Sequence, residues 1–317
     1  MTNGQPTPPV AVLVVAWNSA AVVPGFLEAL PAGMGDLPWR LIVADNDSAD
    51  DTVAVIRALA PDAVVVPMGR NAGYAAGINA ALDVAAGWDG GYRAALVCNP
   101  DIRLRPGCGP TLVAALGTAL PDGATVGIAV PQLYQDGVEG PLPSLRREPS
   151  VSRALGEAVI GNRRAGRFPR LSELVTDPAA YTRKTRADWA TGAMMAMSAA
   201  CLDACGPWDE SYFLYSEETE FCLRAGDHGY AVQLQPGAQA VHLGGESRVS
   251  PRLWTLLVLN RVRLHGRRHG GLSTAAFRAA VLLREASRAA LGRGRAPNRA
   301  AAAALLSSAA LRATPGP

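Results

Sequence analysis

The sequence predicts a doubly wound α/β fold, in which helices cover both faces of a mostly parallel sheet. A continuous apolar run at 10–16, rich in valine, is typical of a strand that is buried on both faces of a parallel sheet. Four such runs alternate with helical patterns in the first hundred residues, as βα units do. The runs stop at polar residues, and open parallel sheets bind ligands at these carboxyl ends of their strands.

The elements of this half follow in order along the chain. The turn at 17–19 (Trp-Asn-Ser) is expected to cap a helix that reaches Leu30. Ser48 or Asp50 is expected to cap the helix after the second strand. Right-handed crossovers should join the parallel strands. We expect strands at 10–16, 41–44, 63–67 and 92–98, a helix at 52–59, and a further helix that begins within 70–79.

The second half of the sequence is less regular. Residues 131–188 are rich in Pro, Gly and Arg and weakly periodic, which indicates a long excursion from the sheet. Residues 189–197 restore a buried, strand-like pattern, and 232–241 indicate another strand that ends at His242. One or two helices with interleaved arginines are expected after Pro251.

Composition excludes several classes of protein. A chain of 317 residues with 49% hydrophobic and 18% charged residues is long and apolar enough to bury a core. The net charge of +3 gives no argument for nucleic acid as a partner. Lys184 is the only lysine and no Gly-Lys-Ser/Thr occurs, which excludes P-loop enzymes.

The sequence also predicts the cellular setting. Its five cysteines are odd in number and form no Cys-x-x-Cys pair, which favours free thiols in a reducing cytoplasm. The N-terminus lacks a basic region followed by an apolar run, so no signal peptide is expected. Because no apolar stretch reaches the roughly 18 residues of a spanning helix, we expect a soluble protein or one at a membrane surface.

The turn after the first strand argues against two kinds of nucleotide site. A dinucleotide-binding domain would place Gly-x-Gly-x-x-Gly there, but the residues at 16–21 include no glycine, which makes NAD or FAD an unfavoured cofactor. A sugar nucleotidyltransferase would place a glycine-rich loop with a lysine there, and that is missing too. The polar, acidic strand ends suit the base and ribose of a nucleoside instead.

A crowded acidic run follows two aromatic residues at 212–224. Glu217, Glu218 and Glu220 stand beside large apolar side chains, a setting in which the pKa of a carboxyl can rise towards that of a useful base. The alternative is an acidic first helical turn, favoured by the helix dipole, with Ser216 as its N-cap.

Two further residues suggest a metal site. Asp101 closes the fourth strand, and His242 follows the last one and precedes two glycines. Together with a diphosphate they would make a shell for Mg²⁺ or Mn²⁺, because hard oxygen ligands suit these cations. The alternatives are an ordinary turn aspartate and a solvated loop histidine.

Taken together, these segments resemble the family 2 glycosyltransferases, especially the rhamnosyltransferase-like branch. The resemblance covers roughly residues 9–270 and rests on motifs in the family's order. The run 212–224 resembles Tyr-x-Glu-Asp-x-Asp-Leu-Cys-x-Arg, with Glu218 and Glu220 in place of two aspartates. The other matching segments are 14–18, 45–52 (with Asp51 where glycine is usual), 71–79, 99–101, 189–193, 206–213 and 242–247.

The resemblance implies a GT-A type, Rossmann-like fold with C-terminal helices and a metal-dependent, inverting hexosyl transfer. Glu218 would be the general base, with Glu217 and Glu220 as the other candidates. Asp101 and His242 would hold Mg²⁺ or Mn²⁺. The nucleotide would be bound by Trp17, Asn18, Asp45, Asn46, Arg70, Gly73, Asn79 and Asn99, and the acceptor by Trp189, Gly192 and Glu220.

The resemblance also implies substrates and a location. The donor would be a dTDP- or UDP-sugar, foremost dTDP-rhamnose, and the acceptor a lipid-linked saccharide of cell wall or polysaccharide biosynthesis. The enzyme would be cytoplasmic and could sit on the inner face of the membrane, because arginine-bearing helices after Pro251 would suit an anionic lipid surface. Their alternative is ordinary packing with solvated arginines.

Other readings stay open beside this one. They are a soluble natural-product acceptor, an inactive nucleotide-sugar-binding homologue, and a homodimer. The expected parts of the chain are a nucleotide-sugar-binding half at 1–105, an acceptor-binding and catalytic half at 106–250, and a helical extension at 251–317.

Overall fold

A mixed sheet forms the centre of the computed structural model, which describes residues 7–135, 138–244, 250–292, 295–313 and 316. The strands of this sheet follow the order β3-β2-β1-β4-β10-β6-β11-β5, and β8 pairs with the outer part of β11. The strands are β1 (Val10–Ala16), β2 (Trp39–Asp45), β3 (Val64–Pro67), β4 (Ala94–Cys98), β5 (Ile102–Leu104), β6 (Thr125–Tyr134), β8 (Thr185–Ala187), β10 (Met194–Ser198) and β11 (Tyr230–His242). A small separate sheet pairs β7 (Leu145–Arg146) with β9 (Trp189–Ala190).

The first four predicted strands are confirmed, and β3, β2, β1 and β4 run parallel. β10 then runs antiparallel to both β4 and β6, which the sequence did not reveal. The strand-like pattern at 189–197 is divided between β9 and β10, because the chain leaves the small sheet before it enters the large one.

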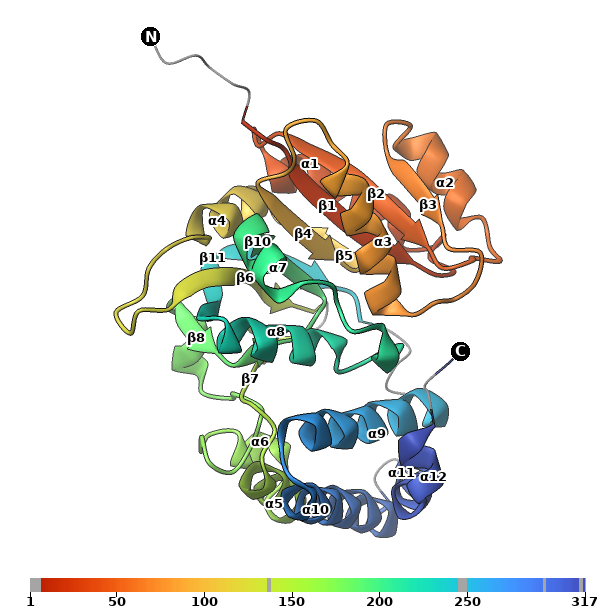
Figure 1. Ribbon diagram of the computed structural model, residues 1–317, viewed down its shortest axis with the longest axis vertical. Coiled ribbons are helices and arrows are strands. Elements are labelled where there is room, and N and C mark those ends of the chain that lie inside the picture. Colours follow the sequence, from red (N-terminus) through yellow and green to blue (C-terminus); the bar gives the residue numbers. More distant parts are fainter. Residues whose placement is uncertain (1–6, 136–137, 245–249, 293–294, 314–315, 317) are drawn as a thin grey trace.

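Helices cover both faces of the large sheet, as expected (Figure 1). Val10, Val12 and Val14 of β1 pack on the side of α1 and α4, whereas Leu13 and Val15 pack on the side of α3, α7 and α8. Burial on both faces is the reason that β1 is a continuous apolar run. These helices are α1 (Val23–Met34), α2 (Thr52–Leu59), α3 (Tyr74–Ala86), α4 (Cys108–Ala115), α7 (Ala199–Cys205) and α8 (Glu217–Asp227).

A helical unit lies below the sheet in Figure 1. It combines α5 (Val151–Val159) and α6 (Asn162–Ala165) with α9 (Pro251–Arg268), α10 (Gly271–Ala290), α11 (Arg295–Leu306) and α12 (Ser308–Arg312). Its core gathers Ala154 of α5 with Val258, Phe277 and Val281. The expectation of one or two helices after Pro251 is therefore wrong, since alanine-rich stretches interrupted by arginine conceal the apolar face that the helices share.

The arginines of α9 are also placed differently from the expectation that they suit a lipid surface. Arg261 is buried against Glu157 and Glu173, and Arg267 pairs with Asp209. Arg263 donates to the backbone carbonyls of residues 310, 311 and 313, and Arg268 pairs with Glu148 and Asp227. These cations hold α9 to the rest of the protein. Among the described helices, none combines the length and apolar character that crossing a bilayer requires.

Candidate active site

The first cluster of predicted site residues lies at the carboxyl ends of β1 and β2. Asp45 ends β2 and is only 6% exposed. Its Oδ2 accepts a hydrogen bond from the Ser48 amide at 3.2 Å, whereas its buried Oδ1 has no partner in the described part of the chain. An unsatisfied buried acceptor costs about 1–3 kcal/mol, so Oδ1 is suited to a hydroxyl or N–H of a ligand.

Asn18 joins the loops that follow these two strands. Its amide N–H donates to Ser48 Oγ at 2.9 Å, and its side-chain Oδ1 accepts from the Ala49 amide at 2.8 Å. The preceding Trp17 is 54% exposed and stands free for stacking on a base. Arg70 is exposed on the loop after β3.

The helix cap predicted at Ser48 or Asp50 needs correction. Asp51 occupies the N-cap position of α2, and its side chain makes no capping hydrogen bond within the described chain. Asp50 nevertheless accepts from the amide of Thr52, the first helical residue, at 3.1 Å. The Asp50 side chain thus accepts a hydrogen bond from the first helical residue, although Asp50 lies one position before the N-cap.

Asn46, Gly73 and Asn79 position the segments around the site with their own polar groups. The Nδ2 of Asn46 donates to the Gly73 carbonyl at 3.0 Å, which holds the loop before α3. Asn79 lies further along α3, where its Nδ2 donates to the Trp208 carbonyl and its Oδ1 accepts from the Trp208 amide. Both ends of the Asn79 side-chain amide are therefore bonded to Trp208.

Gly73 allows the chain before α8 to approach α3. Its φ is +95°, a region that favours glycine, and a Cβ there would stand 2.3 Å from the Phe213 carbonyl oxygen. That oxygen accepts a hydrogen bond from the Tyr74 amide at 2.8 Å. The contact between Tyr74 and Phe213, 139 positions apart in the sequence, therefore depends on the absence of a side chain at residue 73. This contact brings the acidic run to the start of α3.

Asp101 and His242 meet because β5 and β11 pair antiparallel with His242 opposite Ile102. The Nε2 of His242 lies 3.2 Å from Oδ2 of Asp101, and the Leu243 amide donates to the Asp101 carbonyl at 3.1 Å. The other carboxylate oxygen, Oδ1, is buried without a hydrogen-bond partner among the described residues. Gly245 and Ser247 of the closing motif lie outside the described residues.

These two residues fit a divalent cation. A carboxylate oxygen and an imidazole nitrogen are both ligands that Mn²⁺ accepts, and the unpartnered Oδ1 of Asp101 is oriented by a paired Oδ2. No group of three or more His, Cys, Asp and Glu that could hold a metal occurs in the described residues. A cation here would therefore need further oxygens from a ligand, as a diphosphate supplies.

The acidic run begins α8 after a strained turn. Phe213, Tyr215 and Ser216 have φ values of 63°, 68° and 75°, which side chains of this kind rarely adopt. Ser216 occupies the N-cap position of an acidic first turn, as the alternative interpretation placed it, but its side chain makes no capping hydrogen bond within the described chain. A capping serine needs an extended backbone, and the left-handed conformation of Ser216 removes it. Strain of this kind persists only where the surroundings hold it.

Helix α9 supplies that support. The Nδ2 of Asn260, a fully buried residue, is shared among the carbonyls of Tyr212 at 2.8 Å, Leu214 at 2.9 Å and Tyr215 at 3.1 Å. Its Oδ1 accepts from the Arg263 guanidinium at 2.6 Å. The conformation of the turn before the acidic helix is thus tied to the C-terminal helices.

Glu217 and Glu218 differ in their surroundings. Glu217 is 2% exposed, and burial raises its pKa well above the ordinary value, with the neighbouring Glu218 carboxylate adding to the rise. Glu218 is partly exposed; burial raises its pKa too, but backbone N–H groups at the start of α8 and the Arg146 guanidinium oppose the rise. Glu218 is therefore the more exposed of the two acids, and the groups around it oppose the rise in its pKa; its Oε2 is buried without a hydrogen-bond partner among the described residues.

Gly192 faces the side chain of Glu218. A Cβ at Gly192 would stand 3.2 Å from the Glu218 Cβ and 3.3 Å from its Cγ. The missing side chain leaves room for the extra methylene of glutamate. Trp189, in β9, donates from Nε1 to the Arg147 carbonyl at 3.0 Å, while both carboxylate oxygens of Glu220 pair with Arg224 at 2.9 Å.

Two residues at this site were not selected from the sequence. Tyr74 donates its hydroxyl to Asn99 Oδ1 at 2.8 Å and also lies 3.2 Å from the Gly192 carbonyl. Burial raises its pKa well above the ordinary value, and Glu217, Glu218 and Asp101 contribute to the rise through their charges. The Tyr74 hydroxyl thus contacts Asn99, near Asp101, and Gly192, which faces Glu218. The place of Tyr74 inside the 71–79 motif was the available signal.

Arg146 is the second residue that the sequence did not single out. It lies in the weakly periodic excursion, where no pattern marks it. In the structure its guanidinium donates to the carbonyls of Pro143 and Leu145, stands 5.7 Å from the centre of the Trp189 ring, and lowers the pKa of Glu218.

The buried state of Glu217 predicts a stability that depends on pH. Because its folded-state pKa is raised above 4.5, the folded protein keeps a proton that the unfolded chain releases, and stability falls as pH rises through the folded-state pKa. Glu217→Gln should match the wild type in acid and exceed its free energy of unfolding increasingly towards neutral pH. Denaturant unfolding over a pH series measures this, with the exposed Glu139→Gln as control. A Glu217→Gln difference that does not vary with pH would contradict the prediction.

Known proteins share this sequence pattern. The family model of glycosyl transferase family 2 matches residues 11–153. An N-acetylglucosaminyl-diphospho-decaprenol L-rhamnosyltransferase of Mycobacterium tuberculosis is 25% identical over 241 residues, which cover 73% of this chain and 75% of that protein. The match includes the strand ends at Asp45 and Asp101.

Solved structures share the fold. The mannosyltransferase PcManGT from Pyrobaculum calidifontis, in complex with GDP-Man and Mn²⁺, has a TM-score of 0.53 and 17% identity, over 96% of this chain and 83% of that one. The structure of GalNAc-T7 with UDP, GalNAc and Mn²⁺ has a TM-score of 0.53 and 14% identity. The match covers 82% of this chain and 48% of the GalNAc-T7 chain. S. aureus TarS has a TM-score of 0.50 and 13% identity over 94% of this chain, which spans 54% of the TarS chain. These comparisons confirm the GT-A type fold, and over residues 11–153 the chain resembles glycosyl transferase family 2.

Proposed function

We propose that this protein is an inverting glycosyltransferase that moves a deoxysugar, foremost rhamnose, from a nucleoside-diphosphate sugar to a hydroxyl of a lipid-linked saccharide. The observation that carries the proposal is the arrangement around Tyr74. Its hydroxyl donates to Asn99, two residues before Asp101, and also lies 3.2 Å from the carbonyl of Gly192, the glycine that faces Glu218. This half-buried tyrosine thus contacts both the strand end beside the predicted metal pair and the segment that faces the predicted base.

The strand ends of β1 and β2 would bind the nucleoside. The unpartnered Oδ1 of Asp45 is suited to a base N–H or a ribose hydroxyl, and Trp17 to stacking on the base. Arg70, on the loop after β3, is exposed and carries the positive charge that a diphosphate attracts. Asn18 and Asn46 would act by holding the two loops in place.

Asp101 and His242 would hold Mn²⁺ or Mg²⁺ on the diphosphate. The cation, when bound, would neutralise the charge that builds on the leaving nucleoside diphosphate. The protein contributes the carboxylate and imidazole from adjacent strands, whose register keeps the two side chains together before any ligand binds. Preformed ligands lower the cost of ordering the site.

Glu218 would take the proton of the acceptor hydroxyl. The acceptor oxygen then bonds to the anomeric carbon while the bond to the diphosphate oxygen breaks and its electron pair leaves with the nucleoside diphosphate. A single displacement of this kind inverts the anomeric centre and needs no covalent intermediate. A raised pKa suits the task, because proton transfer is most efficient when the pKa of the base lies near the working pH.

The choice of rhamnose and of a lipid-linked acceptor is supported by the relative from Mycobacterium tuberculosis. The name of that protein includes rhamnose as the sugar transferred and a diphospho-decaprenol as the acceptor. A direct test incubates the protein with dTDP-rhamnose, Mn²⁺ and a short polyprenyl-diphosphate N-acetylglucosamine. Release of dTDP together with a rhamnosylated lipid would support the proposal. Release of dTDP only with a soluble natural-product acceptor would assign a different acceptor, and nucleotide binding without any transfer would indicate an inactive homologue.

The metal pair predicts a stabilisation that needs both nucleotide and cation. Ligand at about 100 times its Kd stabilises a folded protein by about 2.7 kcal/mol. We expect dTDP with Mn²⁺ to raise the melting temperature of the wild type more than dTDP alone, and Asp101→Asn to lose the manganese-dependent part. The exposed Asp203→Asn on α7 is the control. An Asp101→Asn variant that retains the manganese-dependent rise would remove Asp101 from the metal site.

A further inference from the structure

The helices α5 and α6 lie in the helical unit below the sheet (Figure 1). This part of the chain carries exposed apolar side chains. Leu155 and Val159 lie one turn apart on the outer face of α5, and Val159 is 77% exposed. Ile160 follows directly, and Phe168, beyond α6, is 55% exposed. The Arg153 side chain on α5 donates to the Pro169 carbonyl at 2.9 Å, so the segment with Phe168 lies beside α5.

Arginines accompany these apolar residues. Arg163, Arg164, Arg167 and Arg170 are all exposed. None of the four forms a hydrogen bond or ion pair through its side chain within the described parts of the chain, unlike the arginines of α9. We call these four arginines, with Leu155, Val159, Ile160 and Phe168, the α5–α6 surface.

The acidic residues of this segment and of the adjoining α10 are buried, although the exposed Asp177 follows Thr176, whose hydroxyl donates to the Arg163 carbonyl. The only acid in 151–170 is Glu157, which is 3% exposed and pairs with Arg261. The only acid in the adjoining α10 is Glu285, which is fully buried and pairs with Arg284. The surface is therefore positive as well as apolar.

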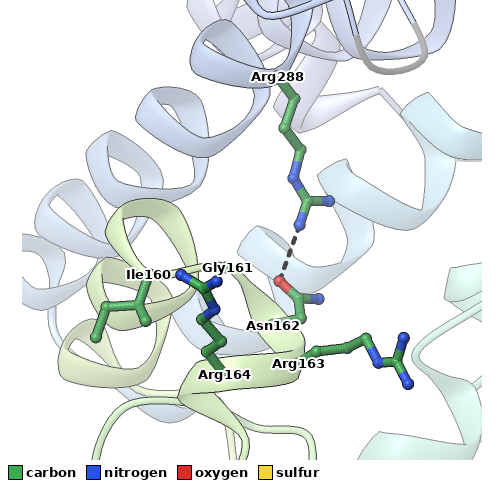
Figure 2. A pocket seen from close by; sticks show the side chains of 6 residues that line it. All are labelled: Ile160, Gly161, Asn162, Arg163, Arg164 and Arg288. Atoms are coloured by element: carbon green, nitrogen blue, oxygen red, sulfur yellow. Dashed lines mark hydrogen bonds between the residues drawn. The ribbon is translucent and has the colours of Figure 1, made fainter.

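A pocket opens where α6 meets the end of α10. Figure 2 shows Arg288 reaching from α10 to Asn162, to whose Oδ1 it donates at 3.0 Å, with Arg163 and Arg164 on either side. The pocket has a volume of about 460 Å³ and is lined by Ile160, Gly161, Asn162, Arg163, Arg164 and Arg288. Three guanidinium groups around one pocket are a donor set for phosphate oxygens.

We propose that the α5–α6 surface docks the protein onto a bilayer that contains anionic phospholipid. The arginines would bind headgroup phosphates, with one headgroup in the Arg288 pocket, while Val159, Ile160 and Phe168 enter the boundary between headgroups and acyl chains. Charge complementarity favours a membrane over a neutral apolar partner. Exposed Leu, Val, Ile and Phe favour it over a nucleic acid, which would bind the arginines alone.

The biological purpose of this docking rests on the proposed function, because a lipid-linked acceptor is presented at the surface of a membrane. The proposed docking goes beyond that function in locating the contact on the excursion at 151–170 rather than on the arginines of α9. Binding to a membrane and sugar transfer can be measured separately, so that either proposal can fail without the other.

The test is sedimentation of the full-length protein with vesicles of phosphatidylcholine alone and of phosphatidylcholine mixed with phosphatidylglycerol. We expect binding to the mixed vesicles only, weakened by salt. Each arginine near an anionic surface contributes about fivefold in partitioning, so Arg163→Gln with Arg164→Gln should lower binding about 25-fold. Val159→Asp should also lower it. The matched controls are Arg57→Gln and Leu59→Asp, exposed residues of α2, which should bind like the wild type.

Several outcomes would overturn the proposal. The first is wild-type protein that stays in solution with the mixed vesicles. The second is a loss of vesicle binding in the α2 controls that equals the loss in the α5–α6 variants. The third is α5–α6 variants that only convert a dimer into a monomer, which would identify a second copy of the chain as the occupant of the surface. Vesicle binding that depends on these residues in a protein that transfers no sugar would sustain this inference and reject the proposed function.

Discussion

Glu218→Gln is expected to lower kcat for sugar transfer by about 10² to 10⁴-fold, the usual contribution of a general base. Glutamine keeps the size of the side chain and its packing against Gly192, but it cannot accept the proton of the acceptor hydroxyl. Nucleotide binding should stay near the wild-type level, because Asp45 and the Asp101–His242 pair are unchanged. Steady-state kinetics and a thermal shift with dTDP and Mn²⁺ measure the two effects on the same variant.

Glu217→Gln is the matched control for this prediction. Glu217 is buried with its Oε2 unpartnered in the described chain, and burial raises its pKa well above the ordinary value, which favours the neutral carboxyl that glutamine imitates. This variant should retain transfer within about tenfold of the wild type. Glu217→Gln as inactive as Glu218→Gln would show that the base is not Glu218 alone.

The pH profile of the wild type offers a second check on Glu218. Its pKa is raised above the ordinary 4.5, so kcat should increase with pH along an acid limb that lies above this value, as the carboxyl loses its proton. The Glu218→Gln variant should lose this limb. An acid limb unchanged in Glu218→Gln would belong to another group.

Asn260→Ala is expected to lower both stability and kcat, although Asn260 contacts no predicted ligand. It would remove the shared donor of three carbonyls in the turn before α8. The Tyr212 carbonyl would keep the Leu214 amide as a donor, while each buried carbonyl left unpaired costs about 1–3 kcal/mol. The left-handed conformations of Tyr215 and Ser216 would then lose their support. Because a shift of about 1 Å in a catalytic group can cost about 10²-fold in rate, kcat should fall on that scale.

A stability-matched variant separates positioning from general weakening. Val281→Ala empties part of the core of the helical unit and should cost about 2 kcal/mol without touching the turn. We expect Val281→Ala to keep kcat and the acid limb of the pH profile, whereas Asn260→Ala changes both. Equal kcat values for the two variants at a temperature where both are folded would assign Asn260 a purely structural role.

The sequence predicted the fold where local patterns were strong. The parallel strands β1 to β4 were foreseen, since each is a continuous apolar run; burial on both faces explains the runs of β1 and β4, whereas β3 is a partly exposed edge strand. It also placed Asp45 and Asp101 at strand ends, because polar residues must follow a buried strand where the chain returns to solvent. These inferences depend only on neighbouring residues, which is why they could be made.

Prediction was weaker where structure depends on contacts between distant segments. The antiparallel β10 looks like any buried strand, since strand direction is decided by the path of the chain between strands. The structure has more helices after Pro251 than the one or two expected, because the apolar face of α11 is built largely from alanine. Of the α9 arginines, expected at a surface, Arg261 and Arg267 instead pair with acids far away in the sequence, and Arg263 donates to backbone carbonyls.

The sequence by itself therefore determined the four parallel strands, the metal pair as candidates, and a group of three acids from which a base could come. The tertiary structure alone gave these acids different surroundings: it buries Glu217, pairs Glu220 with Arg224, and leaves Glu218 against Gly192. It also showed that the Tyr74 hydroxyl contacts Asn99 and Gly192, and that Asn260 holds the strained turn. The physical reason is that pKa, exposure and strain are properties of what surrounds a side chain, and those surroundings come from segments that the chain brings together only on folding.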